Sequence, residues 1–207
     1  MVRATLAGRK TMTRCLAGLQ EINENPEAWE LHDLSVDPLL EDTQTGKPFI
    51  LRGLIATFEW VEGGVFRNIR CPYGQVGDGL WGRETFARNP ARGEVFYGAD
   101  YPASIPMRAT KLFEGTGWKP SIHMPRTLCR IEREITAIRI ERLQAITEEE
   151  VFLDGLIPPD APRQGLLSPI RLFTELWDTL NPQQPFARNP WNWVLSFKPL
   201  AQPLETA

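Results

Sequence analysis

The sequence predicts an α+β protein whose strands pair mostly in antiparallel fashion. Strand-forming runs dominate the middle of the 207-residue chain, and two helical patterns follow each other near its end. These runs do not alternate with helices in the βαβ rhythm from which parallel sheets are built. Eighteen prolines and sixteen glycines also predict many turns and loops, which argues against a helical bundle.

Strands are predicted where β-branched and aromatic residues cluster or alternate with polar residues. The run 54–60 is rich in such residues, and Gly63 and Gly64 make a turn before the run 65–70. The content of 127–143 predicts two strand segments with a bend between them. We expect the strands around 79–86, 130–142 and 191–198 to share one sheet. The remaining expected strands are 49–52, 94–97 and 107–109.

Helices are predicted at 2–8, 147–155 and 169–181. The second begins with a capping box, because Thr147 can accept from the amide three residues on and Glu150 can reach back. Gly155 ends that helix. The third begins at Pro169 and repeats apolar residues at helical spacing. Three tryptophans in periodic apolar segments are expected in the core: Trp177, Trp191 and Trp193.

The segment 15–48 is polar, acidic and weakly periodic, which predicts a long loop with one short strand around 28–34. A loop of that length inside a domain is typically a lid or an insertion. We expect a single domain over 1–200, with insertions near 15–48 and 87–125. The tail at 201–207 is expected to be frayed.

Composition and charge exclude several classes of protein. The net charge of −3 disfavours a protein that grips long duplex nucleic acid, so any contact with nucleic acid needs a local basic patch. Three scattered cysteines and two histidines do not suggest a disulfide framework or a zinc site, and no metal or cofactor is expected. No signal peptide or membrane span is recognisable, which predicts a cytoplasmic protein without a membrane partner.

Three separated segments together resemble the ASCH family, which is related to the PUA RNA-binding domains. Residues 7–14 look like the family's opening motif, and Gly77-Asp78 looks like its Gly-Asp turn before a barrel strand. Residues 143–155 and 191–198 resemble its closing strand, Thr-Glu-rich helix and final strand. The segments 81–85 and 118–126 look like a larger subgroup found in bacteriophages and prophages. The resemblance implies a PUA-like β-barrel with flanking helices.

The opening motif is also similar to that of bacterial acetylcytidine amidohydrolases, which are small hydrolases. By this resemblance, Lys10 matches the catalytic lysine and Thr13 the proposed nucleophile, while Asp154 stands where those enzymes have a glutamate. A threonine hydroxyl needs a base within reach, and a lysine serves as one only if its pKa is lowered. The shorter Asp154 puts closure of such a site in doubt. The alternative is that Gly8, Arg9 and Lys10 simply bind phosphate at a helix end.

The candidate ligand-binding residues are Arg9, Arg14, Trp81, Glu84, Ser121, His123 and Arg126. Trp81 either stacks a base or packs in the core. Glu84 either reads a base edge or forms an ion pair with Arg126. His123 either takes part in acid–base chemistry or acts as a structural donor.

These residues lead to two principal hypotheses. The first is a binding module for a single nucleotide or nucleoside, including a modified one, or for single-stranded nucleic acid. The second is an amidohydrolase that acts on an acylated nucleoside through Lys10, Thr13 and Asp154. A single-strand nuclease and a structural phage role stay open, as does the oligomeric state. The absence of a Ser-His-Asp or metal constellation favours binding over catalysis.

Overall fold

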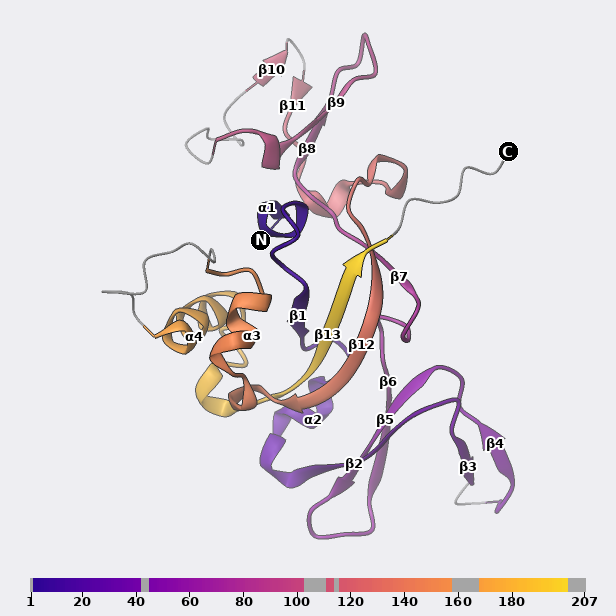
Figure 1. The fold of residues 1–207 in the computed structure, drawn as a ribbon. Helices are drawn as coiled ribbons and strands as arrows, with labels where there is room; N and C mark the ends of the chain where they lie inside the picture. The colour runs from indigo at the N-terminus through magenta and orange to yellow at the C-terminus, as the bar shows by residue number, and fades with distance from the viewer. Residues whose placement is uncertain (1, 42–44, 103–110, 114–115, 158–167, 201–207) are drawn as a thin grey trace.

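The computed structural model describes residues 2–41, 45–102, 111–113, 116–157 and 168–200, without the side chains of 111–116 (Figure 1). It shows an α+β protein with antiparallel strand pairs, as expected. The expected strand at 107–109 and the tail 201–207 lie outside the described residues.

The central sheet has four antiparallel strands in the order β1 (Met12–Cys15), β13 (Trp191–Pro199), β12 (Glu132–Arg142) and β7 (Gly79–Trp81). It curls strongly into a half-barrel (Figure 1). The expectation that 79–86, 130–142 and 191–198 share one sheet is confirmed for β7, β12 and β13, while Phe86 belongs to a separate two-stranded sheet. The prediction of two segments in 127–143 is wrong. β12 is one continuous strand, and a register shift between Ile135 and Ala137 bends it without ending it.

A second sheet contains β2 (Trp29–Val36), β5 (Leu54–Trp60) and β6 (Phe66–Arg70). The prediction of a long loop over 15–48 is therefore wrong, although its short strand falls inside β2. The segment also contains α2 (Gln20–Glu24), the 3₁₀ helix η1 (Pro26–Ala28) and β3 (Leu39–Glu41). The few apolar residues of this segment are enough to anchor it, because Leu19, Ile22 and Trp29 are buried in the core between the sheets.

Short hairpins extend both ends of the molecule. β3 pairs with β4 (Pro48–Ile50), β8 (Phe86–Arg88) with β9 (Val95–Tyr97), and β10 (Lys111–Phe113) with β11 (Thr116–Gly117). Strands β8 to β11 lie at the opposite end of the curled sheet from β2 and β5 (Figure 1). The expected strand 79–86 is divided into β7 and β8. Gly82 at the break still donates its amide to the carbonyl of Ile131 at 2.7 Å, and the central sheet ends there on this strand.

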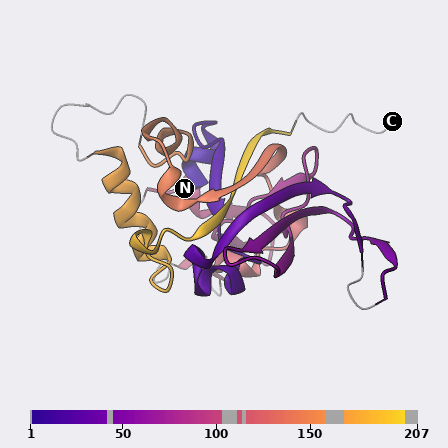
Figure 2. The same ribbon diagram turned by 90° about the horizontal axis from the view of Figure 1, so that it is seen from below.

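Three helices pack around the central sheet: α1 (Val2–Leu6), α3 (Glu148–Leu153) and α4 (Pro169–Leu180). The capping box of α3 is present as predicted. In the view from below, α4 lies on one side of the curled sheet and the long strands β2 and β5 on the other (Figure 2). Five further 3₁₀ turns connect the elements: η2 (Gly98–Asp100), η3 (Ser121–His123), η4 (Arg126–Leu128), η5 (Leu143–Ala145) and η6 (Phe186–Arg188).

The two faces of β13 belong to different parts of the molecule. Trp193 and Leu195 are buried in the core between the sheets. A separate core cluster beneath α3 and α4 contains Val151, Phe173 and Trp177. The predicted core positions of Trp177 and Trp193 are confirmed, and Trp191 is half-buried against the core. The half-barrel thus has an inner face and a helix-covered face.

Gly155 lies where the end of α3 packs closely against Ala4 and Lys10. Its φ is +74°, and an added Cβ would lie 2.7 Å from the Cβ of Lys10 and 2.9 Å from that of Ala4. Gly63 also has a positive φ, +85°, but its Cβ would meet nothing within 4 Å. We expect Gly155→Ala to reduce the free energy of unfolding by about 1–3 kcal/mol more than Gly63→Ala does, because only Gly155 adds a steric clash to the backbone strain. Urea denaturation measures both, and equal losses would contradict this packing.

Candidate functional site

Strand β1 separates the predicted site residues onto two faces of the central sheet. Successive side chains of a strand point to opposite faces. Arg14 contacts Glu150 of α3, so Met12 and Arg14 share the helix-covered face. Thr13 and Cys15 share the inner face, because they pair with Leu195 and Trp193 of β13, which lie in the core between the sheets. The candidate residues of β1 therefore face two different sites that meet at this strand.

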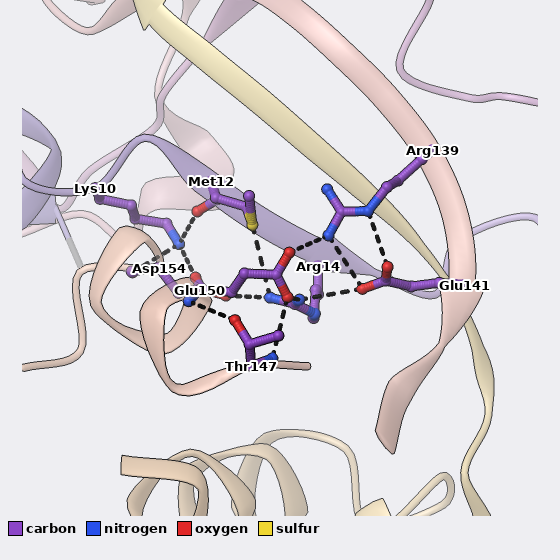
Figure 3. Close-up of polar contacts among 8 residues, drawn as sticks. All are labelled: Lys10, Met12, Arg14, Arg139, Glu141, Thr147, Glu150 and Asp154. Atoms are coloured by element: carbon purple, nitrogen blue, oxygen red, sulfur yellow. Dashed lines mark hydrogen bonds and ion pairs between the residues drawn. The ribbon is translucent and has the colours of Figure 1, made fainter. Parts of the chain in front are cut away.

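On the helix-covered face, the structure brings Lys10 and Asp154 into contact (Figure 3). Lys10 follows α1 and is 9% exposed, and Asp154 is the C-terminal cap of α3. The Lys10 ammonium donates to the carboxylate of Asp154, to its carbonyl oxygen at 3.0 Å and to the carbonyl oxygen of Met12 at 2.8 Å. All three donors of an ammonium group thus have acceptors.

Arg14 extends this contact into a larger network of buried charges (Figure 3). Its Nη2 donates to Glu150 at 2.6 Å and to Glu141 at 3.1 Å, and its Nη1 lies 3.6 Å from Asp154. Arg139 of β12 binds the same two glutamates. Three cations face three carboxylates: Lys10, Arg14 and Arg139 against Glu141, Glu150 and Asp154. The network has no net charge.

Glu150 has two roles that the sequence reasoning did not connect. It completes the capping box of α3 by accepting from the amide of Thr147 at 3.2 Å, and it also binds Arg14 and Arg139. The sequence reasoning also missed Arg139 and Glu141. They stand two residues apart on a predicted strand, so they share a face, and that spacing could have indicated a charged pair.

A pocket of about 270 Å³ opens beside this network, and we call it the helix-side pocket. Lys10, Thr13, Arg14 and Asp154 form one wall, and α4 with the residue that follows it forms the other. That second wall is mostly apolar and consists of Phe173, Leu176, Trp177, Leu180 and Asn181.

A pocket of about 330 Å³ lies on the inner face between α1, β1 and β7, and we call it the barrel-side pocket. It shares Thr13 with the helix-side pocket. The residues that line it are Val2, Thr5, Thr13, Cys15, Tyr73, Leu80, Trp81, Gly82, Arg83, Ile131, Arg133, Leu195 and Phe197. Trp81 is half-buried, and the guanidinium of Arg83 lies over its ring, 5.2 Å from the ring centroid.

Two titratable groups of the barrel-side pocket, Cys15 and Tyr73, are held neutral by burial. Burial raises the pKa of the Cys15 thiol, and it also raises the pKa of the Tyr73 phenol above its usual range. Both groups are therefore uncharged hydrogen-bonding partners at neutral pH. Together with the Thr13 hydroxyl, they give this mostly apolar pocket a small neutral polar patch.

Glu84 is held in an ion pair, as one of its two interpretations supposed, but its partner is Arg130 and not Arg126. Glu84 is 2% exposed and binds Arg130 through two hydrogen bonds of 2.7 and 3.0 Å. Arg130 also binds Asp100 and lies over the ring of Tyr97. This clamp joins the segment between β7 and β8 to β9 and η2, and the sequence reasoning missed Arg130 because it belongs to no recognised motif.

The remaining predicted ligand residues line neither of the two pockets. Ser121 and His123 lie in η3 and Arg126 begins η4. The η3 turn does lie near the mouth of the barrel-side pocket, because Arg83 donates to the carbonyl of Ile122 at 3.3 Å. Arg9 is half-buried between α1 and β1. Roles for these residues in binding stay predictions.

The buried pair of Lys10 and Asp154 gives a direct test of the network. We expect Lys10→Met or Asp154→Leu alone to reduce the free energy of unfolding by about 3–5 kcal/mol, because each leaves a buried charge uncompensated. The double variant should cost less than the sum of the two single variants. Urea denaturation measures all three.

The matched control is the exposed pair of Arg171 and Glu175 on α4. Arg171→Ala should cost less than about 1 kcal/mol, since exposed ion pairs contribute little. A loss for Lys10→Met no larger than that for Arg171→Ala would contradict a buried pair.

No family model, curated protein or solved structure matched the chain. Among the described residues, no group of His, Cys, Asp and Glu side chains is arranged to hold a metal ion. In the same part of the chain, no helix is long and apolar enough to cross a membrane. The two pockets at β1 are therefore the candidate functional sites of the chain.

Proposed function

We propose that this chain is a PUA-like module of ASCH type that binds a single nucleoside or nucleotide, free or in an unpaired strand. The observation that carries the proposal is the barrel-side pocket, where Trp81 and Arg83 lie together above apolar walls. The curled four-stranded sheet with flanking helices is consistent with a PUA-like fold.

The size and walls of the barrel-side pocket suit one nucleobase. A pocket of about 330 Å³ is at the small end of the range for ligand sites, and its walls include Leu80, Ile131 and Phe197. Trp81 offers a flat ring on which a base can stack. The neutral groups of Thr13, Cys15 and Tyr73 can exchange hydrogen bonds with an uncharged base edge.

The charge of the pocket also favours a small ligand. Arg83 is exposed and uses one of the five guanidinium donors on Ile122. It can therefore contact a phosphate at the mouth while the base lies inside. A net charge of −3 over the whole chain opposes binding to long duplex.

The binding test combines a thermal-shift panel of nucleosides, nucleotides and short single strands with titration of the best ligand. We expect Trp81→Leu to weaken binding by about 5- to 150-fold, since stacking one base contributes roughly 1–3 kcal/mol. Arg83→Ala should weaken the binding of nucleotides more than that of nucleosides. It should also reduce, by about one unit, the slope of the logarithm of the binding constant against the logarithm of the salt concentration.

Arg92→Ala serves as the control, because Arg92 is exposed and does not line the pocket. It should leave binding unchanged. A wild-type chain that shows no shift with any member of the panel would refute the proposal. So would equal effects of Arg83→Ala and Arg92→Ala.

A second candidate, the amidohydrolase, is favoured by one observation: Lys10 meets Asp154 beside a pocket that Thr13 also lines. Two features weigh against it. The ammonium of Lys10 already donates to three acceptors, so it offers no lone pair to a hydroxyl. Thr13 also lines the barrel-side pocket, with its side chain on the opposite face of β1 from Arg14. We therefore rank binding above catalysis.

The catalytic candidate is tested by following release of acetate from acetylcytidine. We expect little or no release by the wild-type chain, and no gain from Asp154→Glu, which restores the residue of the similar enzymes. Any trace of acetate release by the wild-type chain should also be measured for the Lys10→Ala and Thr13→Ala variants, where we expect it to persist. Robust turnover that each of these two substitutions reduces by orders of magnitude would instead establish the enzyme, because residues that act as a unit fail together.

A further inference from the structure

We propose that the ligand of the barrel-side pocket is one nucleotide of a longer unpaired strand, whose neighbouring phosphates bind a basic surface around the mouth of the pocket. We call this surface the basic rim. It consists of six cations: Arg3, Arg9, Arg83, Lys119, Arg126 and Arg133. The inference rests on the proposed function, because it narrows the class of ligand for the same pocket.

The first observation is the separation of charge along the chain. The segments 1–14, 79–83 and 116–131 contain Lys and Arg but no Asp or Glu, whereas 21–42 contains Asp and Glu but no Lys or Arg. Residues of all three basic segments line the barrel-side pocket. The acidic segment includes β2, which lies at the far end of the curled sheet from β8 and α1 (Figure 1). The fold therefore gathers the basic segments at the end of the molecule that contains the pocket.

The second observation is that the fold leaves the basic rim charged. Lys10, Arg14 and Arg130 belong to the same segments, but each is bound to carboxylates. None of the six rim cations forms an ion pair with a residue that the structure describes. Glu132 lies across the β7–β12 pairing from Trp81 but does not line the pocket. Positive charge thus remains around the mouth of this pocket in a chain whose net charge is −3.

The third observation is that the cations lie on more than one side of the pocket. On the β7 side, Arg83 donates at 3.3 Å to the carbonyl oxygen of Ile122 in η3. Lys119 precedes that turn, and Arg126 begins η4 just after it; both are exposed. Arg133 lines the pocket and donates at 2.6 Å to a carbonyl oxygen of α1. One phosphate at Arg83 would leave the other cations unused, whereas a strand offers a phosphate at every nucleotide.

The fourth observation is apolar surface among these cations. Ile122 is 69% exposed and stands between Lys119 and Arg126 in the sequence, and Trp81 offers its ring inside the pocket. Sites for single strands combine such apolar and aromatic contacts for bases with cations that follow the phosphates. An acidic peptide of aspartate and glutamate offers the charge but no flat ring for Trp81. In a duplex the bases are paired and stacked, so an unpaired strand is the class that fits both features.

A length series tests this inference. The full chain is titrated with 5′-phosphorylated oligomers of riboadenylate and of deoxythymidylate that contain one, three or six nucleotides. We expect the longest oligomers to bind at least about tenfold more tightly than the mononucleotides. The slope of the logarithm of the binding constant against the logarithm of the salt concentration should steepen from about −0.7 to about −2, since each phosphate contact of a single strand contributes about −0.7.

A double variant tests the rim itself. Lys119→Ala combined with Arg126→Ala removes two rim cations that do not line the pocket. It should weaken the longest oligomers at least about tenfold and reduce the slope by about 1.4, while binding of the mononucleotides stays unchanged. The matched control is Lys47→Ala combined with Arg92→Ala. Both are exposed cations outside the rim, so their loss removes the same charge and should change neither measurement.

Three outcomes would overturn the inference and leave the nucleotide site standing. They are equal binding of the shortest and longest oligomers, equal effects of the two double variants, and competition by hexaglutamate as strong as that by the longest oligomers. The last would assign the rim to an acidic protein segment. A chain that binds none of the oligomers would refute the nucleotide site and this inference with it. If the rim variant fails to fold, the length series still decides.

Discussion

Strand β1 carries opposite chemistry on its two faces, and the arrangement of both pockets depends on that alternation. Arg14 points into a buried charge network under α3, while Thr13 and Cys15 point into the half-barrel. Pairing with β13 fixes which residue points where, because Thr13 lies opposite Leu195 and Arg14 opposite Val194. A register slip of one residue would place Arg14 in the apolar core between the sheets and Thr13 against the helix.

The charge network also holds a helix that would be marginal alone. α3 has six residues, too few to be stable in isolation. It is fixed at its first turn by Glu150, which binds Arg14, and at its end by Asp154, which binds Lys10. Buried ion pairs contribute little net stability, but leaving one partner unpaired is costly. The network therefore selects one position of α3 on the sheet, and with it the shape of the helix-side pocket.

Local sequence signals correctly predicted those elements whose capping residues or apolar spacing lie within the element itself. The capping residues Thr147 and Glu150 predicted α3, and the helical spacing of apolar residues predicted α4. The segment 15–48 was misjudged because only a few apolar residues anchor it, and sequence periodicity cannot report contacts with distant strands. The contact of Lys10 with Asp154 was suggested only by a resemblance. Arg130 and Arg139 could not be assigned partners, because their partners are fixed by folding and not by spacing along the chain.

The same limit applies to counting charges near the N-terminus, because it does not report the carboxylates that folding brings against them. Residues 1–14 contain four cations and no acid, and one alternative was that Gly8, Arg9 and Lys10 bind phosphate. Folding brings Asp154, Glu150 and Glu141 from distant segments against those two residues and cancels their charge. A phosphate would meet three carboxylates there. The cation best placed for phosphate is Arg83, which lies above Trp81 on the other face of the sheet. Compensation of charge within the fold thus removes Lys10 and Arg14 from the uncompensated cations of the N-terminal segment.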